Sequence, residues 1–287
     1  MSGFEKLWVK SYIRAFVFLL ACVLLACAVV FFVPSIANST ARLLWNGFHQ
    51  PQAALFIDKT DAYLALTIGN YYFGSPRSSD GSSGYDPTLA LAAYQEALHI
   101  NPQTSSANYQ IGRILFIRGD YNEAISALNS ELSIAPNNFR AYYVRGLVNA
   151  YAGNYASADN DFAVFISHAL TEWAGYNDRA WALSLAGRYQ DALAVMQVAF
   201  KQVPNAADNP WLWNTLGTAQ LDLYDYADAF SSFTTAQKLA SSLTEADWLG
   251  AYPGNDPTSA PAGIARFQKA ITTNLQTAAL FTGSGKK

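Results

Sequence analysis

Cysteine and histidine are scarce in this sequence. Its 287 residues include two cysteines, Cys22 and Cys27, which both fall in one apolar segment, so the rest of the chain cannot form a disulfide. The three histidines, His49, His99 and His168, are not spaced like metal ligands. The sequence therefore predicts neither a metal site nor a cofactor.

Charged residues are also few. They make up 14% of the chain, against roughly 25% in typical soluble proteins, and the formal net charge is −3. A nucleic-acid-binding protein shows the opposite sign or a dense basic patch, and this sequence has neither. We therefore expect no nucleic acid among the partners.

Recognisable catalytic motifs are missing as well. The nearest candidate is the group of polar residues Asp247, Asn255 and Asp256 close to Trp248 and Tyr252. A turn whose side chains cap the backbone explains these residues better than an active site does. We expect a protein that is not an enzyme and has no small-molecule substrate.

One long apolar run is present near the N-terminus. Ala15-Val33 comprises 19 residues without a charge or a strongly polar group. As a helix it would be roughly 28 Å long, close to the ~30 Å thickness of a bilayer's hydrocarbon core. The run predicts one membrane-spanning helix.

The flanks of this run predict its orientation. Lys6, Lys10 and Arg14 precede it, whereas only Arg42 follows within about 20 residues, the range over which the positive-inside rule counts charges. The N-terminus is then cytoplasmic, and the rest of the chain lies outside. We expect a single-pass protein of the cytoplasmic (inner) membrane.

Two alternatives compete with a retained anchor. A signal peptide could be cleaved after Ser35-Ile36-Ala37, although its apolar region usually runs only about 7 to 15 residues. Leu24-Leu25-Ala26-Cys27 looks like a lipoprotein box, but cleavage there would leave the apolar stretch Val29 to Val33 at the mature N-terminus. Retention or cleavage of the N-terminal helix stays open.

After the run, a pattern recurs every 34 residues, with three extra residues before its last copy. Each copy has a small residue where one helix would approach another closely, a second small residue on the partner helix, and, in most copies, a glycine that suits a left-handed helix end or a proline that stops a helix. The positions are Gly112, Gly146, Ala180 and Gly217; Ala124, Ala158, Ala192 and Ala229; Gly119, Gly153 and Gly187; and Pro102, Pro136 and Pro204.

This pattern resembles the tetratricopeptide repeat (TPR) family over roughly residues 62 to 240. The resemblance implies an all-α fold, a right-handed superhelical solenoid of helix-turn-helix repeats, here preceded by one transmembrane helix. We count about five units, the first interrupted by a Ser/Gly insertion at 75–86. The expected organisation is a cytoplasmic N-terminus at 1–14, a transmembrane helix at 15–34, a juxtamembrane linker at 35–57, the solenoid at 58–241, a capping region at 242–281 and a disordered tail at 282–287.

The resemblance also implies a binding groove on the concave face. Aromatic residues and arginine dominate the binding energy of protein interfaces, and they are frequent at the positions that line this face in the family. Arg113 and Arg140 suggest an acidic or aromatic-acidic segment, or a helix, as the ligand. The expected lining residues are Tyr109, Arg113, Phe116, Arg140, Tyr143, Leu147, Asn177, Trp181, Trp211 and Asn214.

Not every ligand of the family is expected. The groove that grips a chaperone's C-terminal carboxylate uses lysine and asparagine, and Tyr109, Tyr143 and Asn177 replace that pattern here. The sequence therefore predicts a membrane-anchored scaffold for other proteins, helping to assemble a cell-envelope complex. The alternative is an accessory subunit of an integral membrane complex, held through its transmembrane helix.

Overall fold

The computed structural model describes the backbone of residues 3–48, 50–74, 85–252 and 256–282, and within these ranges the side chains from residue 16 onward except those of residues 31 and 32. The chain is helical throughout these ranges and contains no strand there. It divides into two units, Met1–Asn70 with Ala92–Thr104, and Tyr71–Leu91 with Ser105–Lys287. Of the Ser/Gly insertion expected at 75–86 and the tail expected at 282–287, residues 75–84 and 283–287 lie outside the described residues.

Three helices begin the first unit: α1 (Gly3–Phe32), α2 (Pro34–Phe48) and α3 (Pro51–Ile57). α1 ends before Pro34, which has no backbone N–H to continue the helical hydrogen bonds. Within the described residues, no single helix meets the length and hydropathy criteria for a membrane span. Phe16–Val30 and Pro34–Phe48 meet them only together, as a pair bent by 94°.

The segment 35–57, expected as a linker, is mostly helical. α2 packs against α3, and the contact buries Ala37, Ala41 and Ala54. Asn38 donates hydrogen bonds to Asp58 and Asp61, at 2.9 and 3.2 Å. Small alanines rather than large apolar residues form this contact.

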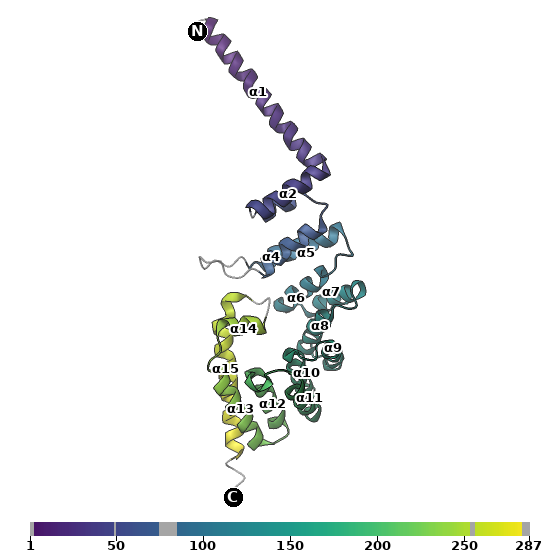
Figure 1. Cartoon of the computed structure of the whole chain (residues 1–287), viewed down its shortest axis with the longest axis vertical. Coiled ribbons are helices and arrows are strands. Elements are labelled where there is room, and N and C mark those ends of the chain that lie inside the picture. Colours follow the sequence, from purple (N-terminus) through teal and green to yellow (C-terminus); the bar gives the residue numbers. More distant parts are fainter. Residues whose placement is uncertain (1–2, 49, 75–84, 253–255, 283–287) are drawn as a thin grey trace. The chain divides into compact units, whose positions relative to one another are not determined.

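Helix pairs follow, each made of a first and a second helix that pack together (Figure 1). The first pair extends over both units, and the four others belong to the second unit. This confirms an all-helical, TPR-like solenoid. The pairs are α4 (Ala62–Gly74) with α5 (Pro87–Ile100), α6 (Ala107–Arg118) with α7 (Tyr121–Ile134), α8 (Phe139–Tyr151) with α9 (Tyr155–His168), α10 (Trp173–Leu185) with α11 (Tyr189–Gln202), and α12 (Pro210–Asp222) with α13 (Tyr226–Ala240).

Close approach within most pairs depends on a glycine on the first helix, and Ala180 takes that place in α10. A Cβ atom built on Gly146 would lie 2.9 Å from the Phe162 ring, and one on Gly217 would lie 2.8 Å from the Phe233 ring. Both phenylalanines are fully buried. The small residues of the repeat pattern therefore have the packing role that the sequence predicts.

The turn between the two helices of a pair is left-handed. Gly119, Gly153 and Gly187 have φ angles of 85°, 81° and 74°. In the last pair Tyr224 occupies the equivalent place, with φ 64° and 77% of its surface exposed. A bulky residue with positive φ is strained, because its Cβ crowds the backbone.

Glu131 is fully buried and caps the start of a neighbouring helix. Its carboxylate accepts hydrogen bonds from the backbone N–H groups of Ser106 and Tyr109, at 2.9 and 3.3 Å, and from Asn138 Nδ2 at 2.9 Å. The first N–H groups of a helix have no partner within the helix itself. Glu131 therefore satisfies the start of α6 from the second helix of the same pair.

Two more helices complete the second unit, α14 (Glu245–Ala251) and α15 (Ala260–Thr282), with short 3₁₀ turns at Ala206–Asp208 and Pro257–Ser259. α15 lies along α13 (Figure 1). Ile271 and Ala278 are fully buried in this contact, where Phe267 and Leu275 also pack. α15 thus covers the apolar side of the last pair, the role the sequence assigns to a capping helix.

Candidate partner-binding surface on the first helices

The residues expected to bind a partner all lie on first helices of the second unit: α6, α8, α10 and α12. We call the surface formed by their central side chains the first-helix surface. It is defined by Tyr109, Arg113, Tyr143, Asp178, Trp181 and Trp211.

A polar network joins three first helices at the centre of this surface. The Tyr143 hydroxyl donates to Asp178 Oδ2 at 2.5 Å, and Asn177 Nδ2 donates to Asp178 Oδ1 at 2.9 Å. The Thr215 hydroxyl donates to Asn177 Oδ1 at 2.7 Å. The network therefore links α8, α10 and α12, and it occupies the Asn177 amide that was expected to bind a ligand backbone.

Burial raises the pKa of the Asp178 carboxyl to about 6, although the hydrogen bonds from Tyr143 and Asn177 act in the opposite direction. Burial, and then the charge of Asp178, raise the pKa of the Tyr143 hydroxyl well above its ordinary value. Among the described residues no cationic side chain forms an ion pair with Asp178. The site is a buried carboxylate compensated by neutral donors.

Aromatic rings connect neighbouring repeats on the same surface. Phe116 meets Tyr151 edge to face at 5.3 Å between ring centroids, and Tyr151 meets Trp181 at 5.1 Å. Tyr151, which the sequence reasoning did not select, is still 54% exposed. Phe116 and Trp181 therefore pack partly against the adjacent repeat and keep only part of their surface for a partner.

The two arginines differ from each other. The Arg113 guanidinium lies 4.7 Å from the centroid of the Phe73 ring and 5.6 Å from that of Tyr109. Arg113 also donates to Gln110 Oε1 at 2.8 Å, so it is held in place. Arg140 is exposed and forms no ion pair within the described residues.

The C-terminal segment covers the other end of the surface. Phe267 of α15 stacks on Trp211 with 5.5 Å between centroids, and Tyr252 meets Trp211 at 6.4 Å. Asn274 donates to Asn214 Oδ1 at 3.4 Å. Trp211 and Asn214 were expected to face an open groove, but the returning chain packs over both of them, and Trp211 is only 8% exposed.

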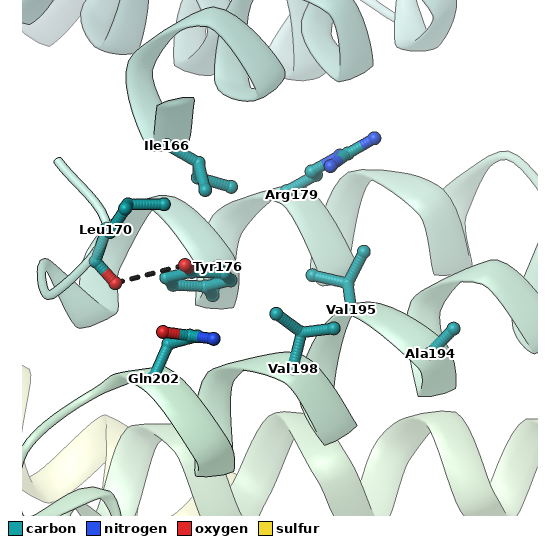
Figure 2. Close-up of a pocket in the computed structure, with 8 residues that line it drawn as sticks. All are labelled: Ile166, Leu170, Tyr176, Arg179, Ala194, Val195, Val198 and Gln202. Carbon is teal, nitrogen blue, oxygen red and sulfur yellow. Dashed lines mark hydrogen bonds between the residues drawn. The ribbon is translucent and has the colours of Figure 1, made fainter. Parts of the chain in front are cut away.

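A separate apolar hollow of about 350 Å³ lies between α9 and α11 (Figure 2). At its base the Tyr176 hydroxyl donates to the Leu170 carbonyl oxygen at 3.0 Å. The sequence reasoning did not identify this hollow; its signal is the pair of exposed or half-buried valines on α11. The lining residues are Ile166, Leu170, Tyr176, Arg179, Ala194, Val195, Val198 and Gln202.

Potential metal ligands do not gather on this surface: no three His, Cys, Asp or Glu side chains in the described ranges are placed to hold an ion together. Two residues of this site, Asp178 and Tyr252, were not predicted from the sequence. Asp178 follows Asn177 in the middle of a first helix, and it is not among the positions that line the concave face in the family, so it was not selected. Tyr252 lies outside the repeats and was read as part of a turn.

Comparison with known proteins agrees with this architecture. Residues 86–139 match the sequence profile "Tetratricopeptide repeat". No curated protein matches the sequence significantly. Together with the helix pairs, these findings place the fold in the TPR class.

Solved structures of the same class superpose on the chain. MamA (residues 41 to the end) from Desulfovibrio magneticus RS-1 is 24% identical with a TM-score of 0.54, over 64% of this chain and 97% of that one. A TPR protein from Parabacteroides merdae is 18% identical with a TM-score of 0.51, over 85% and 84%. YrrB, described as a TPR protein with an unusual peptide-binding site, is 19% identical with a TM-score of 0.52, over 67% and 93%. At these identities the likeness concerns the fold alone.

Proposed function

We propose that this protein is a scaffold that binds segments of partner proteins on its first-helix surface. The observation that carries the proposal is the combination of Tyr143, Asp178, Tyr151 and Trp181, which come from consecutive repeats and form one partly exposed aromatic and polar surface. Aromatic side chains around buried polar groups are typical of interface hot spots. Proteins with TPR repeats bind other proteins or peptides and are generally not enzymes, and YrrB is described as having a peptide-binding site.

The chemistry of the surface favours a ligand that brings both apolar and polar groups. The Arg113 guanidinium lies over the Phe73 and Tyr109 rings and is held in a fixed place. Asp178 lies on the next helix pair but one and carries the opposite charge. This pairing replaces the simple expectation of an acidic ligand, which rested on Arg113 and Arg140 alone.

We also propose that the N-terminal helix anchors the protein in the cytoplasmic membrane, with the repeats outside the cytoplasm and a role in assembling a cell-envelope complex. Support comes from apolar side chains of α1 that are exposed among the described residues: Phe16, Phe18 and Leu25 are 66%, 72% and 66% exposed. An apolar helix without a protein partner is stable in lipid. The competing proposal is an accessory subunit that uses α1 itself to pack against an integral complex.

The experiment that tests the scaffold is co-purification. The full-length protein is purified in mild detergent from its native membrane, beside a Tyr143→Ala/Trp181→Ala variant and a Phe230→Ala control. Phe230 is an exposed aromatic residue on α13, outside the first-helix surface. Circular dichroism first verifies that all three forms have equal helix content.

We expect specific proteins to accompany the wild type and the control and to be lost from the double variant. Partners that stay with all three forms would reject the first-helix surface and favour contact through α1. Recovery of the protein in the soluble fraction without detergent would reject the anchor.

A further inference from the structure

The segment between α13 and α15 forms a short helix, α14, whose start is stabilised by contacts within the segment itself. Thr244 and Asp247 make a capping box: the Thr244 hydroxyl accepts from the Asp247 N–H at 3.2 Å, and Asp247 Oδ2 accepts from the Thr244 N–H at 2.9 Å. Such a box fixes the start of a helix. Trp248 and Tyr252, four residues apart, lie together with 4.4 Å between ring centroids.

These two rings make the contacts of the segment. Trp248 packs directly on Gly263 of α15, where a Cβ atom has no room. Tyr252 meets Trp211 on the first-helix surface, 6.4 Å away between centroids. Burial and the nearby charge of Asp178 raise the pKa of the Tyr252 hydroxyl, so this hydroxyl lies within electrostatic reach of the centre of that surface.

The attachment of this segment is otherwise weak. α14 contains no buried residue, whereas α12 buries Leu212 completely and α15 buries Ile271 completely. The buried Trp211 indole N–H has the Tyr252 hydroxyl as its neighbouring acceptor, but their contact falls outside standard hydrogen-bond geometry. A buried donor with a poorly aligned acceptor recovers only part of the free energy of a hydrogen bond, and a ligand with better geometry would recover the rest.

We propose that residues 244–252 are a resident, displaceable ligand of the first-helix surface, and that the external partner is a helical segment with two aromatic side chains four residues apart. This rests on the proposed scaffold function and names its ligand. Helical ligands dock on protein surfaces through side chains three or four residues apart, the spacing that Trp248 and Tyr252 already show.

A purely structural role of α14 as an end cap fits the contacts less well. α15 alone covers α13, through Phe267, Ile271 and Leu275. α14 itself packs against α15 rather than extending the stack of helix pairs. The end of the solenoid therefore stays covered when α14 moves away.

The test uses the chain's own sequence as the probe. A fluorescent synthetic peptide with the sequence of residues 241–258 is titrated into three full-length proteins in detergent: wild type, the vacated variant Trp248→Ala/Tyr252→Ala, and the control Phe230→Ala. Fluorescence anisotropy reports binding. We expect the vacated variant to bind the peptide at least tenfold more tightly than wild type and the control, whose surface stays occupied.

Two further measurements locate the contact. A peptide in which both aromatic residues are alanine should not bind. Adding Trp211→Ala to the vacated variant removes the ring that Tyr252 contacts and should weaken binding at least tenfold. Equal binding to wild type and vacated variant, or no binding to a vacated variant with wild-type helix content, would overturn the proposal.

Hydrogen exchange on the wild type covers the case in which the vacated variant fails to fold. Backbone amides of residues 248–252 should exchange at least tenfold faster than those of α13 and α15. Protection equal to that of α13 would show a fixed structural element and reject displacement. If no protein co-purifies with the wild type although the vacated variant binds the peptide, only the scaffold function is rejected, so the two failures are distinguishable.

Discussion

The hydroxyl of Tyr143 donates a 2.5 Å hydrogen bond to the carboxylate of Asp178 across the boundary between two repeats. Asp178 lies on α10 and Tyr143 on α8, and neither helix belongs to the pair of the other. The bond therefore fixes one repeat against the next on the surface that we assign to partner binding.

The first prediction concerns the charge of Asp178. Its pKa is raised to about 6 in the folded protein from an ordinary value of 3.8, so the folded state holds this proton more tightly than the unfolded state. The contribution of Asp178 to the free energy of unfolding is therefore largest below pH 4 and falls as the pH rises from about 4 to about 6. In Asp178→Asn the free energy of unfolding should no longer fall over this pH range. The variant should be more stable than wild type at pH 7.5, by about 1 to 2 kcal/mol.

Urea unfolding of both proteins between pH 3.5 and 8 measures this difference, with Asp225→Asn as the control for an exposed carboxylate. A pH-independent difference between Asp178→Asn and wild type would contradict a raised pKa.

The second prediction concerns Asp159, which accepts hydrogen bonds from Arg179 at 2.7 Å and from Arg188 at 2.6 Å. Burial acts to raise the pKa of Asp159, but the two arginines outweigh it and lower the pKa below its ordinary value of 3.8. Its stabilising contribution is therefore present above about pH 4 and is lost as the pH falls through the lowered pKa.

Asp159→Asn should reduce the free energy of unfolding by about 0.5 to 1.5 kcal/mol at pH 7 in low salt, since both arginines are partly exposed. The loss should shrink in 1 M NaCl and disappear near pH 2. Thermal unfolding at the two pH values and two salt concentrations checks it, and a loss of equal size at pH 2 would count against the ion pairs.

Tyr224 provides the third prediction. Its φ of 64° places a bulky residue where three other repeats have glycine. Tyr224→Gly should raise the free energy of unfolding by about 0.5 to 1 kcal/mol, because glycine adopts this conformation without crowding its Cβ. Calorimetry measures the melting temperature, which should rise in Tyr224→Gly and fall in the reverse change Gly187→Tyr. A lower melting temperature for Tyr224→Gly would mean that the side chain contributes packing that outweighs its strain.

Glu131 provides the fourth prediction, because it satisfies two backbone donors at the start of α6. Glu131→Ala leaves these buried groups without an acceptor and should reduce the free energy of unfolding by about 2 to 3 kcal/mol. Glu131→Gln keeps one side-chain acceptor and should lose less. Equal losses in chemical denaturation would argue that packing, not capping, is what Glu131 supplies.

The sequence predicts the helix pairs well because their causes are local and periodic. A small residue on the first helix faces a large one on the second in successive copies, as Gly146 faces Phe162 and Gly112 faces Leu128, so spacing alone indicates the contact. The placement of the expected surface residues on first helices follows from the same register.

The contact in which Phe267 covers Trp211 could not be predicted from the spacing of the repeat. These residues are 56 positions apart, and their contact depends on how the chain returns after the last repeat. Asp178 was missed for a related reason, because its burial comes from neighbouring helices and not from its own sequence context. The short helices α2 and α3 were expected as a linker because both lie outside the 34-residue repeat from which the other helices were predicted.

Tyr252 contacts Trp211 on α12 and lies within electrostatic reach of both Asp178 on α10 and Tyr143 on α8. Repeats of this kind otherwise interact only with their nearest neighbours, so the array unfolds in partly independent sections. A segment that contacts one repeat and interacts electrostatically with two others couples their unfolding. Its release would broaden the unfolding transition, and a partner in its place would sharpen the transition again, so cooperativity itself would report whether the surface is occupied.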